Sequence, residues 1–149
     1  MSSFYPLWWN TTVTVYNKYL DPITQVVTWY KTKVTDAFWK DVSDKLTLGD
    51  TALESNKLIC RIREDARYKD KYLWNALTAK KKAEYFTLGQ GDIIIKGDVA
   101  DVVDEYADGQ RSTDLIEKYK ELQGCLEIQR SSDNTGPGRG LPHYLAQGV

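Results

Sequence analysis

Residues 12–34 read Thr-Val-Thr-Val-Tyr-Asn-Lys-Tyr-Leu-Asp-Pro-Ile-Thr-Gln-Val-Val-Thr-Trp-Tyr-Lys-Thr-Lys-Val. The first part, Thr12 to Tyr19, is rich in β-branched and aromatic residues, which is typical of a strand. Asp21-Pro22-Ile23-Thr24 is predicted to be a turn, because the Asp side chain can bond nearby amides and Pro presets the first turn dihedral. Gln25 to Val34 is then the return strand. The stretch predicts a long antiparallel hairpin.

Further β segments are predicted after this hairpin. The Ile93–Ile95 triplet is the strongest candidate for a buried central strand, because it is a short, continuous β-branched run that follows the turn at Gly91-Asp92. The other expected segments are Phe38–Val42, a pair at Leu46–Thr51 and Asn56–Ile62, Gly124–Arg130 and a final strand at Leu141–Val149. The chain is therefore predicted to be mainly β, of the α+β class.

One clear helix is predicted from Ser112 to about Gln123. Leu115, Tyr119 and Leu122 recur there at helical spacing, and Gly124 suits the position just after a helix. A short basic helix is expected near residues 78–85, with Thr78 as its N-cap. The charged run Arg63–Lys71 is expected to be solvated, and the acidic run Val99–Tyr106 is expected to be a loop or a helical turn.

Length and composition favour a single domain that spans residues 1–149. The formal net charge of −1 gives no general attraction to nucleic acid or to anionic lipid. The sequence contains no basic, apolar leader and no run long enough for a membrane span. Cys60 and Cys125 lie far apart within apolar runs, so we expect buried free thiols in a reducing cytoplasm.

The sequence nominates no catalytic, cofactor-binding or metal-binding residue. His143 is the single histidine, and no Gly-x-Ser-x-Gly elbow accompanies it, so it is expected to be an interface or strand-end residue. The loop at Gly136–Gly140 lacks the P-loop pattern, and Pro137 removes an amide that a phosphate cradle needs. The acids between Asp98 and Asp108 and the basic run Lys80–Lys82 are expected to be solvated surface. We therefore expect a protein that is not an enzyme.

Three segments are candidates for protein contacts. Trp8 and Trp9 are adjacent, and a strand would turn them to opposite faces, so one of them is expected to be exposed unless a partner covers it. The other two candidates are the hairpin tip and a glycine-rich loop, whose backbones can reach a neighbour. Their residues are Asp21, Pro22, Ile23, Thr24, Gly136, Pro137, Gly138, Arg139 and Gly140.

The order of these motifs resembles that of tailed-bacteriophage head–tail connector proteins, in the head-completion or head-closure (stopper) group. The similar features are a Val-Thr-Val first strand with an Asp-led tip, Trp39 after the return strand, a Gly-Asp-aliphatic-Gly strand at Gly91–Gly97, and the terminal Leu141-Pro142-His143-Tyr144. Two features depart from the pattern. The tip lacks the usual glycine, and the stretches 63–85 and 99–123 are long for so small a barrel.

The resemblance implies a small antiparallel β-barrel with helical insertions. It also implies a virion protein of the neck, assembled in the host cytoplasm as a ring, as a hexamer or a dodecamer. Such a ring would join a portal or adaptor protein on the head side to a tail or tail-terminator protein. It would retain packaged phage DNA in its channel without reading the DNA sequence, and it would have no membrane partner.

Alternative functions remain open at this point. Because the tip and the long stretches 63–85 and 99–123 depart from the connector pattern, a minor tail or tail-completion protein is an alternative. Five Trp and ten Tyr also suit a host-surface or carbohydrate-binding β module, because sugars stack on such rings. An enzyme of unfamiliar type is the third class.

Overall fold

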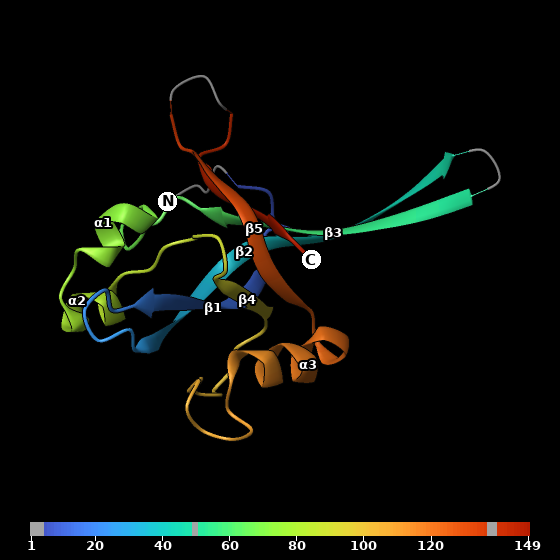
Figure 1. Ribbon diagram of the computed structural model, residues 1–149. Helices are drawn as coiled ribbons and strands as arrows, with labels where there is room; N and C mark the ends of the chain where they lie inside the picture. The colour runs from blue at the N-terminus through green and yellow to red at the C-terminus, as the bar shows by residue number, and fades with distance from the viewer. Residues whose placement is uncertain (1–4, 49–50, 137–139) are drawn as a thin grey trace.

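The computed structural model describes residues 5–48, 51–136 and 140–149, with the side chains of residues 42–56 outside that description. In this part, six antiparallel strands close into a barrel in the order β1-β2-β3-β6-β5-β4 (Figure 1). The strands are β1 (Thr11–Leu20), β2 (Val27–Leu48), β3 (Thr51–Arg63), β4 (Ile93–Lys96), β5 (Cys125–Asn134) and β6 (His143–Gly148). Three helices join them: α1 (Lys71–Asn75), α2 (Ala79–Glu84) and α3 (Ser112–Leu122). The predicted mainly-β barrel is confirmed.

Strand β4 closes the barrel between β1 and β5. Its central residue Ile94 pairs with Val15 of β1 and with Leu126 of β5. The side chain of Ile94 lies in the barrel interior with that of Val15, while Ile93 and Ile95 lie in a second cluster with buried residues of α3. Alternating side chains of a strand point to opposite faces, so the isoleucine triplet is buried on both faces of the sheet. The prediction of a buried central strand is confirmed.

Helix α3 covers the outer face of β4. Leu115 and Tyr119 are buried in the cluster beneath it, as their spacing predicts. At the start of the helix, Asp114 Oδ2 accepts the Arg111 amide at 3.1 Å, while the Arg111 side chain, which has no acceptor, caps no amide. The expectation that Leu122 shares the apolar face is wrong, because that side chain is 71% exposed. Leu122 lies in the last turn, where the helix passes the edge of the sheet.

The basic helix α2 begins after Thr78, which caps the Lys81 amide as predicted. Its surface differs from the expectation at one position. Lys80 and Lys81 are exposed, whereas Lys82 is buried with its Nζ 4.0 Å from the centre of the Tyr19 ring. Lys82 Nζ donates to the carbonyl of Leu77. A cation over an aromatic face keeps a favourable electrostatic contact without water, which allows this burial.

Helix α1 is an element that the sequence reading missed. It follows the charged run, and its N-cap Asp70 accepts the Leu73 amide. Trp74 of α1 is fully buried against Tyr19 and Tyr30. The charged run before it is only partly solvated, because Tyr68 stacks on Tyr144 with ring centroids 3.9 Å apart.

The second hairpin differs most from the sequence reading. Phe38–Val42 is no separate strand, and Leu46–Leu48 belongs to the same 22-residue β2. The partner β3 begins at Thr51, which pairs with Leu48, so residues 52–55 belong to this strand and do not connect two strands. Gly49 and Asp50 of the predicted segment Leu46–Thr51 lie outside the described residues. The last strand pair is confirmed in kind, although β5 continues to Asn134 and β6 starts at His143.

A buried carboxylate ties the start of β4 to β1 and α1. Asp92 is fully buried, and its oxygens accept from the amides of Lys18 (2.9 Å) and Gly89 (2.9 Å), from Asn17 Nδ2 (3.0 Å) and from Lys71 Nζ (3.0 Å). Burial raises the pKa of Asp92, whereas the Lys71 charge and the two amides act in the opposite direction. Only an acceptor with several lone pairs satisfies four converging donors.

Replacement of Asp92 tests this junction. In Asp92→Asn an NH2 group faces donors, so we expect the free energy of unfolding to fall by about 3 kcal/mol. Urea denaturation measures the change. Asp98→Asn is the matched control, because Asp98 makes an exposed ion pair with Lys33 and should cost less than about 1 kcal/mol. Equal losses in both variants would contradict the role given to Asp92.

Both cysteines are buried and free, as expected. Burial raises the pKa of the Cys60 thiol to about 12 and that of Cys125 to about 12. The thiolate is the reactive form, so neither side chain should react with a thiol reagent such as DTNB in the folded protein at pH 8. Two thiols per chain should react after unfolding in urea. Rapid labelling of the native chain would show that the barrel opens locally.

Candidate protein-interaction site

The structure places a two-stranded arm outside the barrel. We define the arm as residues 42–48 of β2 and 51–57 of β3. β1 pairs with β2 only as far as Ala37, and β6 pairs with β3 only from Leu58. Within the described chain, the two strands of the arm therefore pair only with each other. Figure 1 shows the arm projecting away from the barrel. Its two edges present backbone groups that another chain can pair with.

The predicted hairpin tip, Asp21–Thr24, lies at the other end of β2. Asp21 Oδ1 accepts the amides of Ile23 (2.8 Å) and Thr24 (3.1 Å), and the Asp21 amide donates to Val26 O at 3.0 Å. The Gln25 amide donates to Asp21 O at 2.9 Å, with φ of 61° at Gln25. These bonds hold a turn that lacks glycine, which explains how the tip departs from the expected pattern.

The tip presents apolar side chains to solvent. Ile23 is 90% exposed, and Leu20 and Val26 on either side of it are also exposed. Tyr106 of the acidic loop reaches this end of the hairpin, where its hydroxyl accepts the Val27 amide at 2.9 Å. We call Leu20, Ile23 and Val26 the knob. An apolar projection on a fixed turn is suited to contact with another protein.

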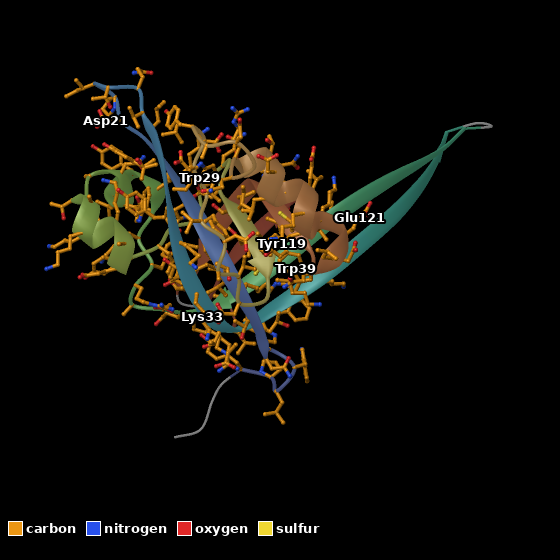
Figure 2. The ribbon with its side chains drawn as sticks, turned by 90° about the horizontal axis from the view of Figure 1, so that it is seen from below. Asp21, Trp29, Lys33, Trp39, Tyr119 and Glu121 are labelled. Atoms are coloured by element: carbon orange, nitrogen blue, oxygen red, sulfur yellow. The ribbon has the colours of Figure 1, made fainter. Side chains whose placement is uncertain are left out.

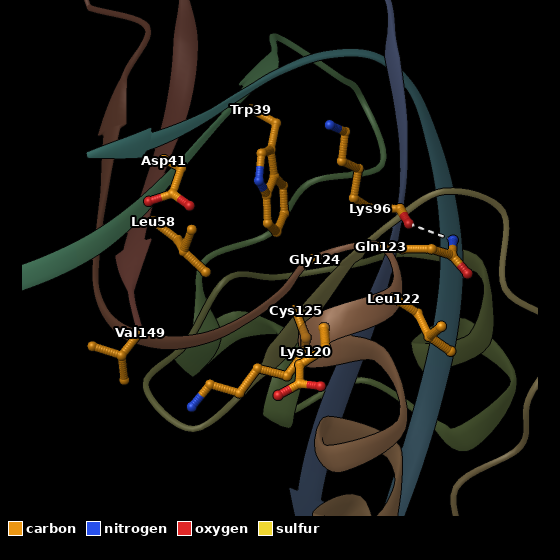
Figure 3. A pocket seen from close by; sticks show the side chains of 11 residues that line it. Trp39, Asp41, Leu58, Lys96, Lys120, Leu122, Gln123, Gly124, Cys125 and Val149 are labelled. Atoms are coloured by element: carbon orange, nitrogen blue, oxygen red, sulfur yellow. Dashed lines mark hydrogen bonds between the residues drawn. The ribbon is translucent and has the colours of Figure 1, made fainter. Parts of the chain in front are cut away.

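A groove lies at the base of the arm, beside the last turn of α3 (Figure 3). Its volume is about 810 Å³. Apolar walls come from Trp39, Leu58, Leu122 and Val149, and the charged side chains are Asp41, Lys96, Lys120 and Glu121. Gly124, with φ of +113°, lets the Trp39 ring lie close, because an added Cβ would be 3.2 Å from that ring. The absence of a side chain at Gly124 thus allows the Trp39 ring to pack against the backbone at the bottom of the groove.

The tryptophan pair lies in a turn before β1, not in a strand. The Trp9 amide donates to Pro6 O at 3.0 Å. Trp9 is buried, with its ring centroid 5.9 Å from that of Phe38 and 6.0 Å from that of His143. Trp8 is 67% exposed. One tryptophan is therefore buried and the other exposed, although a turn and not strand alternation separates them.

The glycine-rich loop connects β5 to β6. Gly136 and Gly140 are described, while Pro137, Gly138 and Arg139 lie outside the described residues. The C-terminal side of the loop is tied to the N-terminal turn, because Tyr5 Oη donates to Pro142 O at 2.6 Å. Trp8, Trp9 and this loop therefore come together at one side of the barrel, and the hairpin tip lies apart from them.

His143, Asp101 and Glu105 each have structural partners. His143 contacts Leu141 O through Nδ1 at 2.7 Å and Asn134 through Nε2 at 3.3 Å. Asp101 accepts from Lys118 and Tyr119, and Glu105 accepts from Trp29 and Ser112, so the acidic loop is fastened to β2 and α3. Asp101 and Glu105 are thus less solvated than the sequence suggests. The described residues contain no His, Cys, Asp or Glu group arranged to hold a metal ion.

No helix in the described part of the chain is long and apolar enough to span a bilayer.

Comparison with known proteins adds one finding. A family of unknown function, DUF6751, matches residues 8–149. The chain belongs to this family. No curated protein and no solved structure matches it. The DUF6751 match covers every strand and helix described above, so the arm, the tip and the groove all lie within the family region.

Loss of the Asp21 carboxylate should loosen the tip. In Asp21→Ala the Ile23 and Thr24 amides lose their acceptor, so their hydrogen exchange should accelerate in NMR spectra, while Asp21→Asn should retain most protection. The two amides lower the pKa of Asp21. Because this pKa is lower in the folded chain, the bonds contribute fully above the usual carboxyl pKa, and protection should decline as the pH falls through the lowered value. Unchanged exchange in Asp21→Ala would contradict this account of the turn.

Proposed function

We propose that this chain is a non-enzymatic structural protein of the tailed-phage virion neck. Copies form a ring that joins the portal side of the head to the tail and helps to retain packaged DNA. The observation that carries the proposal is the arm, whose strands pair only with each other in the described chain. The resemblance of the sequence motifs to head-completion and stopper proteins gives the kind of assembly.

The physical argument starts from the instability of an isolated ribbon. A two-stranded hairpin is marginally stable in water, and it becomes stable when another strand or surface packs against it. The arm extends about seven residues beyond the barrel, which is roughly 20 Å at about 3.3 Å per residue. A projection of this length can reach a neighbouring subunit or another neck protein and add strands to it.

The charge of the chain suits a channel through which DNA must pass. Proteins that neutralise many phosphates bind DNA tightly, because counterions are released. A net charge of −1 allows DNA to move through a ring without being held by its phosphate backbone. We therefore expect contact with DNA without sequence readout, and specific contacts only with protein partners.

Shortening the arm tests the proposal. Residues 42–57 are replaced by Asn-Gly between Asp41 and Leu58, which already face each other across the hairpin. The barrel should keep its thermal midpoint, because the arm adds no residue to the described core clusters. In a phage that lacks the native gene, this variant should yield DNA-filled heads without attached tails, with a loss of titre of at least about 100-fold, as expected when a joining contact is removed. Electron microscopy and plaque titre measure these outcomes.

A control variant and a location experiment complete this test. Tyr72→Ala removes an exposed aromatic side chain on α1, away from the arm, and should leave the titre unchanged. Antibody labelling of purified virions should place the chain at the neck. Labelling along the tail would favour a minor tail or tail-completion protein. Absence from the virion, or a normal titre without the arm, would refute the proposal.

A further inference from the structure

Two complementary surfaces lie at opposite ends of one strand. The knob adjoins Val27 at the start of β2, and the groove contains Trp39, twelve residues farther along the same strand. Twelve residues of extended chain span roughly 40 Å. Figure 2 shows Asp21 at one end of the molecule and Trp39 and Glu121 toward the other. The knob therefore cannot enter the groove of its own chain.

We propose that the knob of one copy inserts into the groove of the next copy, with Ile23 against Trp39 and Leu122. This contact rests on the proposed ring, and it names the two surfaces through which copies meet. Because the surfaces differ, the contact is heterologous, and it repeats head to tail until a ring closes. The occupant of the groove is thus a second copy of this chain.

The knob is already arranged for insertion. The amides of Asp21, Ile23, Thr24 and Gln25 all have acceptors within the turn. Insertion of the tip therefore leaves none of these donors without a partner, and little chain entropy is lost on binding. The projecting side chain, Ile23, is almost entirely exposed and gains the most from losing contact with water.

The groove matches the knob in size and in chemistry. A volume of about 810 Å³ holds several side chains, so the Pro22-Ile23-Thr24 tip fits within it. Trp39, Leu58, Leu122 and Val149 supply apolar walls for Ile23.

Charges beside the two surfaces are also complementary at one position. Asp21 adjoins Ile23 and keeps its negative charge, since backbone amides lower its pKa. The groove presents Lys96 and Lys120, which take part in no ion pair among the described residues, together with Asp41 and Glu121. The carboxylate of Asp21 can thus approach a free ammonium group while Ile23 enters the apolar part of the groove.

A mixing experiment distinguishes this contact from others. Ile23→Asp destroys the knob and keeps the groove, whereas Leu122→Asp destroys the groove and keeps the knob. Light scattering after gel filtration should show an oligomer for the native chain. Either variant alone should associate about 100-fold more weakly and run as a monomer, because a charge replaces the buried apolar contact. An equal mixture should form a heterodimer and nothing larger, since each pair retains one intact contact.

Controls and a second measurement separate the possible failures. Leu73→Asp changes an exposed leucine on α1, outside both surfaces, and should leave the oligomer intact. A mixture of Ile23→Cys and Leu122→Cys chains, both also carrying Cys125→Ala because Cys125 lines the groove, should form a disulfide-linked dimer on mild oxidation. Each variant alone should not, because the proposed contact does not bring two copies of the same new thiol together and Cys60 is buried. A monomeric native chain together with no crosslink would overturn the inference.

Other outcomes overturn the inference while the proposed function stands. If the oligomer persists in both Asp variants but disappears when the arm is shortened, copies meet through the arm and not through the knob. If the Asp variants lose titre while the native chain forms no oligomer and no crosslink, another virion protein occupies the groove. Failure of the proposed function is seen separately, as absence of the chain from purified virions.

Discussion

Closure of the barrel depends on β4, whose three isoleucines are buried on both faces of the sheet. Ile94 fills the interior, and Ile93 and Ile95 support α3 from outside. Asp92 fixes the start of the strand, and the Gly97 amide fixes its end by donating to Thr12 O at 2.7 Å. Without β4 the sheet would open between β1 and β5, and α3 would lose the surface on which it packs. The groove beside the last turn of α3 therefore exists only because β4 closes the barrel.

The arm and the groove follow from a mismatch in strand length. β4 has four residues and β6 has six, whereas β2 has 22 and β3 has 13. The short strands β4 and β6 limit the length of the closed barrel. The parts of β2 and β3 that extend beyond them therefore continue outside the barrel as a two-stranded ribbon. At the point of departure, Trp39 pairs only with β3 in the described chain, whereas Leu58 is the last residue of β3 that still pairs with β6. Both line the groove together with the end of α3. The groove forms at this exit.

The elements that the sequence predicts well are those with a local sequence signal. The isoleucine triplet, the Leu115–Tyr119 spacing and the Thr78 cap are each visible within a few consecutive residues of the sequence, although the triplet and the helix pack against distant segments. The sequence does not predict the arm, because Phe38–Val42, Leu46–Thr51 and Asn56–Ile62 each resemble a separate short strand when considered alone. Gly49-Asp50 between two strand-like runs was the available signal for a reversal. The groove was not predictable, because its lining residues come from five separate segments of the chain. The burial of Lys82 depends in the same way on Tyr19 and Trp74, which are distant in sequence.

The Asp21 tip and the arm differ in whether their backbone hydrogen-bonding groups already have partners. This difference suits them to different kinds of protein contact. At the Asp21 tip, the side-chain carboxylate and local carbonyls bond the turn amides, so a partner gains only from covering side chains. On the arm, the outer edge of each strand offers backbone donors and acceptors, so a partner gains from adding a strand. A side-chain contact can be rigid and specific in shape, whereas strand addition tolerates many sequences. The proposed ring needs contacts of both kinds, because each of its subunits must recognise its own copies and join unlike neighbours. The single strand β2 connects the tip to the arm, since it pairs first with β1 and then with β3.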